Sequence, residues 1–458
     1  MPDEAPTQKS SPQPRRYTRR AVVGGSIAAA SAAIVYAALG GELFGGSNGE
    51  GGGAGLAAVR GDTDAISSES VKVSHLLRRA GFGASKEEHD RYQTLGLQKT
   101  LDELINFTAV DDAEALRIAN QIDVTDPANR AAPIGWWILR MANTKRPLQE
   151  KLTLFWHSLL TSQITVVKDP TAMVAQNEFL RGHATDTFPN VLSGISNDRA
   201  MMVYLDVDGS SRRAPNENYA RELMELFALG VGNYTETDVR EAARAFTGWR
   251  VPKTRVDQVA FTLAAPVFSP QLFDNGTKTF LGKTGNFRGE DIVDIIVDQP
   301  ASASYIVRRL FAYFVFPEPT DDDIAPFVDV YQTSNRSTGA VVEAMLRSDV
   351  FYSPRAYRAV VKSPLEYAVG AIRALGLQST SLQLLQQAGL GRGGGYLTDM
   401  GQVPFEPPNV AGWPGGTHWL NSATIFSRLN LINTLTGGEP LPVPDIGKLS
   451  PQQLARLK

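Results

Sequence analysis

The side chains best suited to chemistry are concentrated in residues 216–249, NENYARELMELFALGVGNYTETDVREAARAFTGW. Glu217, Arg221 and Glu225 recur at intervals of four, so on a helix Arg221 can pair with the carboxylate one turn before or after it. Carboxylates can act as acid and base, and a guanidinium can hold an anionic group of a substrate. These three residues are therefore candidate catalytic groups, with Glu222 as a further carboxylate on the same polar face.

The second half of this run adds Arg240 and Arg244, which lie one turn apart on the polar side of a second predicted helix. Thr235 and Asp238 resemble a capping box that would begin this helix. The charged faces of the two helices can simply be solvated, as most charged helix faces are. Alternatively, the acidic face of the first helix meets the basic face of the second and lines a cleft. In that case both arginines are candidate catalytic groups.

Two tryptophans and three polar residues are candidate substrate contacts. Residues 404–420, PFEPPNVAGWPGGTHWL, are rich in proline and glycine, so we expect a stiff loop that presents the tryptophans. These rings can fill the core, or they can form an aromatic platform for a sugar ring. The candidate substrate contacts are Asn216, Asn218, Lys278, Trp413 and Trp419.

Histidine and aspartate residues allow a different chemistry. His157 has apolar neighbours all round its predicted helix, which is typical of a core histidine; the alternative is a base or a metal ligand, and His183 allows the same choice. Asp206 and Asp208 begin a calcium-loop template, but Ser211 stands where the template requires glycine. A divalent metal at the two aspartates and Glu217, with His157 or His183 as a further ligand, stays an open alternative, and the cofactor is otherwise unknown.

The segment GTKTFLGKTG, residues 276–285, superficially resembles a phosphate-binding loop. The interval from Gly276 to Gly282 is one residue too long, and Gly285 stands where a helix should begin. We therefore reject a Walker-type nucleotide site. A nest of backbone amides that binds another anion is still compatible with the sequence.

Most of the chain has helical periodicity with recognisable helix starts, such as the capping boxes of Ser85 with Glu88 and of Ser363 with Glu366. Strand-like runs occur only around residues 256–284, on either side of a turn-rich loop. The sequence therefore predicts a mainly α fold, a multi-helical globular domain with a small β-hairpin excursion near residues 256–284.

Composition excludes several classes of protein. A chain of 458 residues can bury a large core, and its net charge of -3 argues against a general nucleic-acid binder. The chain has no cysteine, which excludes disulfides, a thiol nucleophile and cysteine-ligated metals.

The N-terminal segment resembles a twin-arginine export signal, because the pair Arg19 and Arg20 precedes a mildly apolar stretch, residues 21–39. Export would make the protein periplasmic, extracellular or anchored at the outer face of the cytoplasmic membrane, and an uncleaved signal would be its only membrane contact. The expected organisation is a signal or anchor at residues 1–44, a glycine-rich linker at 45–70, a single helical domain at 71–436 and a proline-rich tail at 437–458.

Five segments, in this order, resemble the family called domain of unknown function 1800: LLRRAGFG, EKLTLFWHSLL, LDVDGSSRRAPNENYARELMELFALGVGNYTETDVREAARAFTGW, KTFLGKTGNFRGEDI and MGQVPFEPPNVAGWPGG. The resemblance implies an exported bacterial protein, often encoded beside an exported family similar to sulfatases and alkaline phosphatases. It implies no known reaction. Members often have a second histidine at the position of Leu159 and another at the position of Phe273. If those histidines bind metal or transfer protons in relatives, this chain is expected to do so poorly.

Three functions remain after these observations. The favoured one is an exported cell-envelope protein that acts as an interaction or scaffold protein, with a sulfatase-like exported protein as its expected partner. The alternative is an extracytoplasmic hydrolase of polysaccharide or another envelope polymer, which would use the Glu/Arg run for acid–base chemistry. The third is a divalent-metal site at the two aspartates.

Overall fold

Helices make up most of the structure, a computed structural model that describes residue 66 and residues 68–256, 261–377, 385 and 395–438. These residues all belong to one compact unit, which spans residues 49–443. The predicted signal at 1–44, nearly all of the linker at 45–70 and nearly all of the tail at 437–458 lie outside the described residues. No helix among the described residues is long and apolar enough to cross a membrane.

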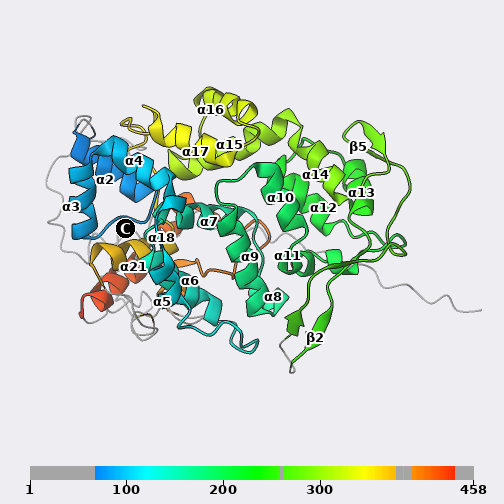
Figure 1. Ribbon diagram of the computed structural model, residues 1–458, viewed down its shortest axis with the longest axis horizontal. Helices are drawn as coiled ribbons and strands as arrows, with labels where there is room; N and C mark the ends of the chain where they lie inside the picture. Colours follow the sequence, from blue (N-terminus) through cyan, green and yellow to red (C-terminus); the bar gives the residue numbers. More distant parts are fainter. Residues whose placement is uncertain (1–65, 67, 257–260, 378–384, 386–394, 439–458) are drawn as a thin grey trace, which may run out of the picture. The chain divides into compact units, whose positions relative to one another are not determined.

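The first half of the unit is helical throughout (Figure 1). Its helices are α2 (Glu69–Arg79), α3 (Lys86–Leu95), α4 (Leu97–Ile105), α5 (Ala113–Ala119), α6 (Ala132–Asn143), α7 (Pro147–Leu159), α8 (Ile164–Val167), α9 (Pro170–Gly182), α10 (Phe188–Ser196) and α11 (Arg199–Tyr204). Helix α7 forms part of the core, because nearly all of its residues are buried, including Trp156 and Leu152.

The charged run 216–249 forms α12 (Asn218–Glu222), a π-helical turn (Leu223–Ala228) and α13 (Glu236–Ala245). Gly230 and Gly232 lie between the helices with positive φ angles of 79° and 90°, a backbone region that glycine enters freely. The remaining helices are α14 (Gly289–Val297), α15 (Pro300–Phe314), α16 (Asp321–Thr333), α17 (Thr338–Arg347), α18 (Pro364–Ala374), α20 (Tyr396–Met400) and α21 (Ser422–Leu435).

Three antiparallel strand pairs lie between α13 and α14, which confirms the mainly α prediction with a small β excursion. β1 (Trp249–Arg250) pairs with β4 (Val267–Phe268), β2 (Lys253–Arg255) with β3 (Phe261–Leu263), and β5 (Lys278–Phe280) with β6 (Lys283–Gly285). The excursion thus begins a few residues before the predicted position. Lys283 lies in a strand, as the rejection of a phosphate-binding loop requires.

Local capping chemistry sets the helix starts where the sequence predicted them. Both hydrogen bonds of a capping box are present at Ser85, Thr235 and Ser363. The loop at residues 404–420 is irregular apart from one 3-10 turn, Gly416–Trp419. These features follow from contacts within four residues, so the sequence alone carries them.

Candidate functional site

Arg221 joins the two helices of the charged run. Its guanidinium donates two hydrogen bonds to Glu236 at the start of α13, at 2.7 and 2.8 Å, and a third to Glu217 one turn earlier, at 3.1 Å. Hydrogen bonding and charge attraction to Glu236 raise the pKa of Arg221, and the same contact lowers the pKa of Glu236. The arginine is thus already occupied by two carboxylates of its own chain.

Arg244 is occupied in the same way from the other end of α13. Its Nε and Nη2 donate to the two carboxylate oxygens of Asp274 at 2.8 and 3.1 Å, and its Nη1 donates to Glu241 at 2.8 Å. Arg240, by contrast, is exposed, and its one hydrogen bond to a described residue is to the Thr237 hydroxyl within its own helix. The two arginines therefore differ: Arg244 ties α13 to a distant loop, and Arg240 faces solvent.

The polar side of α13 makes hydrogen bonds to the loop and to the β5–β6 hairpin that follow it. Asp238 accepts the backbone N–H of Leu281 at 2.8 Å, and Glu241 accepts that of Thr279 at 3.1 Å. Together with Arg244 these two carboxylates make up what we call the α13 clamp. The clamp satisfies backbone groups at the edge of β5, so it has a structural role.

Lys278, a candidate substrate contact, is buried beneath this loop with a side chain only 1% exposed. Its amine donates to the carbonyl oxygens of Asp274 at 2.7 Å and Gly276 at 3.1 Å, and it lies 5.0 Å from the ring centroid of Phe273. Burial lowers its pKa. These contacts turn the amine inward, toward the loop that it holds in place.

Glu222 differs from the other carboxylates of the run because the described residues give it no hydrogen-bond or ion-pair partner. Burial, then the negative charge of Glu225, raise its pKa. Glu225 itself accepts the hydroxyl of Tyr234 at 2.9 Å. Burial and Glu222 together raise the pKa of Tyr204 to about 12. The group lies at a π-helical turn, a feature that often marks functional positions in helices.

His157 is enclosed in the core, 1% exposed, between the rings of Trp137, Phe405 and Trp413 at 5.0 to 5.6 Å. Its Nε2 accepts the backbone N–H of Phe405 at 3.1 Å. Burial lowers its pKa to about 3, so the ring is neutral at physiological pH. This setting favours the core-histidine interpretation. His183 lies elsewhere, with Nδ1 2.8 Å from the Phe179 carbonyl oxygen.

The remaining predicted residues are dispersed. Trp419 is buried beside α20, while Trp413 is half-buried against His157, so the two rings form no common platform. Asn218 donates to Asp206 at 3.2 Å, and the side chain of Asn216 accepts the Asn218 backbone N–H at 2.9 Å.

The geometry at Asp206 and Asp208 does not assemble a metal site. Asp208 binds Lys253 at 2.7 Å through one oxygen and the Val251 backbone N–H at 2.6 Å through the other. No group of three or more potential protein ligands with metal-binding geometry occurs within the described part of the chain. The two aspartates instead hold β1, β2 and the start of α12 together.

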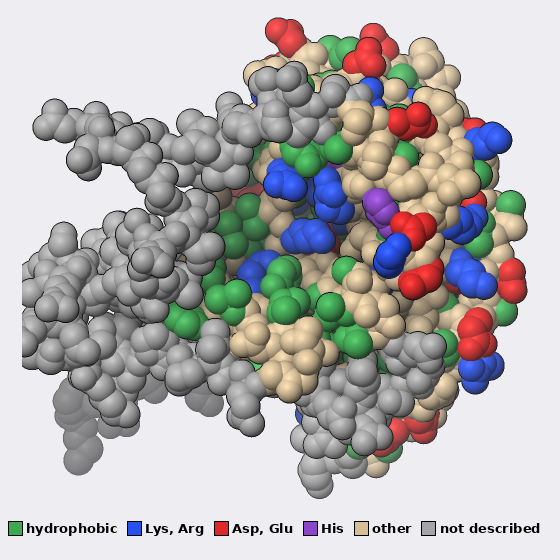
Figure 2. All heavy atoms as spheres, turned by 90° about the vertical axis from the view of Figure 1, so that its left-hand side faces the viewer, with side chains coloured by type: hydrophobic (Ala, Val, Ile, Leu, Met, Phe, Trp, Pro, Cys, Tyr) green, Lys and Arg blue, Asp and Glu red, His purple; other side chains and the backbone are tan. Residues whose placement is uncertain are grey.

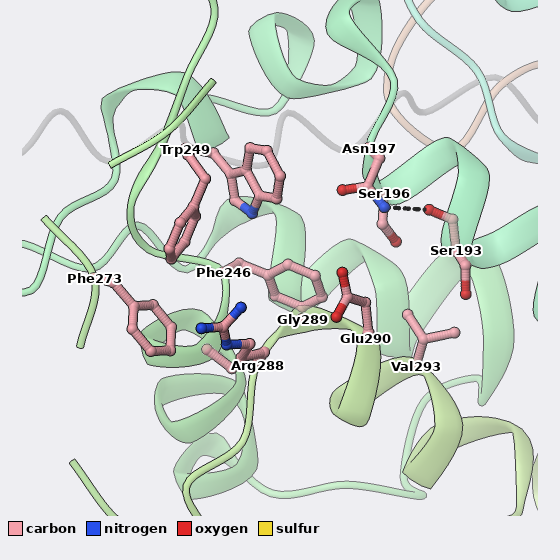
Figure 3. Close-up of a pocket in the computed structure, with 12 residues that line it drawn as sticks. Ser193, Ser196, Asn197, Phe246, Trp249, Phe273, Arg288, Gly289, Glu290 and Val293 are labelled. Atoms are coloured by element: carbon pink, nitrogen blue, oxygen red, sulfur yellow. Dashed lines mark hydrogen bonds between the residues drawn. The ribbon is translucent and has the colours of Figure 1, made fainter. Parts of the chain in front are cut away.

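A pocket of about 150 Å³ lies between α10, α13, α14 and the β excursion (Figure 3). Its aromatic side is formed by Phe246, Trp249, Phe268 and Phe273. Its polar side is formed by Ser193, Ser196, Asn197, Arg288 and Glu290, and the Asn197 amide donates to the Ser193 carbonyl oxygen at 2.9 Å. None of the predicted catalytic residues lines this pocket.

Comparison with known protein families identifies the family of this chain. The family described as "Protein of unknown function (DUF1800)" matches residues 75–457. The chain belongs to this family. No curated protein and no solved structure matches it.

The family resemblance leads us to expect histidine at two positions of this DUF1800 chain, and these positions have different surroundings. Leu159 is buried in the core beside α7's other apolar residues, whereas Phe273 lines the pocket. The Arg288 guanidinium lies 5.7 Å from the Phe273 ring and 5.3 Å from the Phe268 ring. The sequence gives no signal for this pocket, because its residues come from four separate segments whose meeting no local pattern predicts.

Proposed function

We propose that this DUF1800 protein is exported to the cell envelope and acts there as an interaction or scaffold protein for other exported proteins. Support for export comes from Arg19 and Arg20 ahead of an apolar stretch. The expected partner is a sulfatase-like exported protein, because the family resemblance implies such a neighbour.

One observation supports binding over catalysis more than any other: two of the three candidate arginines are already paired with carboxylates. Arg221 is held by Glu217 and Glu236, and Arg244 by Glu241 and Asp274. A substrate anion would have to displace short, two-point ion pairs to reach either guanidinium. The charged run therefore stabilises the fold around it, which leaves the outer surface for partners.

Affinity capture of the full chain from envelope fractions, after cross-linking in the cell, tests this proposal. The expected result is stoichiometric recovery of a sulfatase-like protein, reproduced with the two purified proteins. A variant with Arg19→Lys and Arg20→Lys serves as the control, since it should remain in the cytoplasm and recover no partner. A protein that stays monomeric and partnerless in the envelope would disprove the scaffold function.

A hydrolase of envelope polysaccharide is the second candidate, and Glu222 is the observation that favours it. A half-buried carboxyl with a raised pKa, and with no hydrogen-bond or ion-pair partner in the described part of the chain, is suited to act as a general acid. Glu225 supplies a second carboxylate on the same helical turn.

Release of reducing sugar from envelope polysaccharides tests this alternative. Glu222→Gln should then reduce the rate by about 100-fold or more, as expected for loss of a general acid. Glu114→Gln, an exposed carboxylate paired only with Arg117, is the matched control and should retain full activity. No sugar release by the unaltered protein, or full activity of Glu222→Gln, would contradict the role of Glu222.

A further inference from the structure

Five cationic side chains gather where α2, α7, α18 and α21 meet. They are Arg78, Arg79, Lys151, Lys362 and Arg428, which we call the basic cluster. Figure 1 places α2, α18 and α21 on one side of the molecule, and Figure 2, which views that side, shows Lys and Arg side chains gathered in one patch beside hydrophobic ones.

Among the residues that the structure describes, the one carboxylate in contact with the basic cluster is Glu366, and both of its oxygens already accept hydrogen bonds. One accepts the Lys151 amine, and the other accepts the Ser363 backbone N–H at 2.8 Å in the capping box of α18. Among the described residues, the only charged neighbours that shift the pKa of Lys362 are Arg78, Arg79 and Arg428. Five cations thus share one carboxylate, an excess of positive charge that burial makes costly.

Lys362 stands at the centre of this excess. Its amine lies against α18, where a side-chain carbon added at Gly370 would be only 3.2 Å from it. Its own carbonyl oxygen accepts the Arg428 Nη2 at 3.0 Å, which fixes the guanidinium beside it. Burial first, and then the positive charges of the three arginines, lower the pKa of Lys362 to about 8.

Two guanidinium nitrogens of the cluster have unused hydrogen-bonding capacity. Nη2 of Arg78 and Nε of Arg428 are buried and have no hydrogen-bond partner within the described part of the chain. Both guanidinium groups are steadied by aromatic rings, that of Arg78 by Tyr357 at 5.8 Å and that of Arg428 by Tyr367 at 4.8 Å. Buried donors normally find an acceptor, so these two N–H groups can donate to an oxygen of a bound ligand.

We propose that the basic cluster is a binding site for a phosphate group, held by Arg78, Lys362 and Arg428. A doubly charged oxyanion suits an excess of several cations better than a single carboxylate does, and guanidinium groups bind phosphate through fixed pairs of N–H donors. Arg79 and Lys151 contribute positive potential from behind, since Arg79 donates to the carbonyl oxygens of Tyr313 and Phe314 and Lys151 to Glu366. The phosphate can belong to a small soluble molecule or to a lipid headgroup.

Calorimetric titration of the full chain with inorganic phosphate, at constant ionic strength against chloride, tests the site. We expect saturable binding that Lys362→Gln and Arg78→Gln each weaken by about tenfold or more, the effect of losing one charge-assisted contact. Lys99→Gln, an exposed lysine on α4, is the matched control and should bind phosphate like the unaltered protein. Co-sedimentation with phosphatidylglycerol and phosphatidylcholine vesicles distinguishes the two sources: Lys362-dependent pelleting with the anionic vesicles alone indicates a lipid headgroup, and solution binding without pelleting indicates a soluble phosphate.

Thermal unfolding of the same variants separates binding from a purely structural role. Without phosphate, Lys362→Gln should leave the Tm unchanged or raise it, because it removes repulsion among cations. With phosphate, the Tm of the unaltered protein and of Lys99→Gln should rise, and that of Lys362→Gln should not. Absence of phosphate binding, or equal binding by Lys362→Gln and Lys99→Gln, would overturn the proposal. A phosphate-independent drop in Tm for Lys362→Gln, with no phosphate response in any protein, would also overturn it.

Discussion

Arg244 on α13 and Asp274 in the loop before β5 form a two-point ion pair, with Nε–Oδ2 and Nη2–Oδ1 distances of 2.8 and 3.1 Å. The side chains are 25% and 18% exposed, so solvent screens the pair only in part. This pair anchors the β excursion to the helical core, because the same carboxylate also accepts the Gly276 backbone N–H at 2.9 Å.

Arg244→Lys should destabilise the protein by about 1–3 kcal/mol, since lysine cannot reproduce the two-point geometry. Urea unfolding followed by circular dichroism measures the change. Arg117→Lys is the control: its pair with Glu114 is mostly exposed, so the loss of stability should be much smaller than at Arg244. Equal losses of stability at the two positions would mean that the Arg244–Asp274 pair stabilises the protein no more than an exposed ion pair does.

Glu366→Gln should be among the most destabilising single changes, at about 3–5 kcal/mol, because it leaves the buried Lys151 amine without its counter-charge. Lys151→Met should cost distinctly less, as it removes the buried charge along with the pair. Chemical denaturation of both variants gives the comparison. If Lys151→Met lowers the stability more than Glu366→Gln does, the attraction within the ion pair contributes more at this site than the cost of leaving a buried cation unpaired.

The free energy of unfolding should depend on pH in the way expected for a buried, neutral His157. Its pKa in the folded protein, about 3, lies below the ordinary value of 6.5, so the unfolded chain binds the proton more readily. The stability that the neutral His157 contributes is fully present above pH 6.5. It is lost as the pH falls toward 3, at up to about 1.4 kcal/mol per pH unit.

His157→Gln isolates this term, because glutamine keeps an acceptor for the Phe405 N–H but does not titrate in this range. The stability difference between the two proteins should change in favour of the variant as the pH falls from 6.5 to 3. Other groups titrate in the same window, among them His75 with a pKa lowered to about 3 and Asp198 with a pKa raised to about 6. They cancel in the comparison because both proteins have them. A difference that does not vary with pH would contradict a neutral, buried His157.

Gly412→Ala should destabilise the loop 404–420 by about 2 kcal/mol or more. The glycine has φ of +74°, and an added Cβ would lie 2.4 Å from the Ser158 carbonyl oxygen at the end of α7. Gly416→Ala is the matched control, with φ of +58° but open space around it, so it should incur only about 1 kcal/mol for the backbone conformation. Similar losses at both positions, measured by thermal unfolding, would rule out close packing at Gly412.

The sequence by itself determined the elements of this protein. Capping boxes at Ser85, Thr235 and Ser363, and the glycines after the first charged helix, set helix ends through contacts within a few residues. Strand-like runs around residues 256–284 predicted the small β excursion, although its first strand begins earlier, at Trp249. The family resemblance was likewise contained in the order of its segments, and it is confirmed over residues 75–457.

Only the tertiary structure decided which charges meet. Arg221 pairs with Glu236 and Arg244 with Asp274, 15 and 30 residues away, and Lys151 pairs with Glu366 from 215 residues away. No local spacing carries that information, because an ion pair between segments depends on how whole helices pack. The same holds for the aromatic pocket at Phe273 and for the basic cluster at Lys362. A charged helix face has the same kind of sequence whether it contacts water, a loop or a ligand. Only the packing of the helices decides which of the three it contacts.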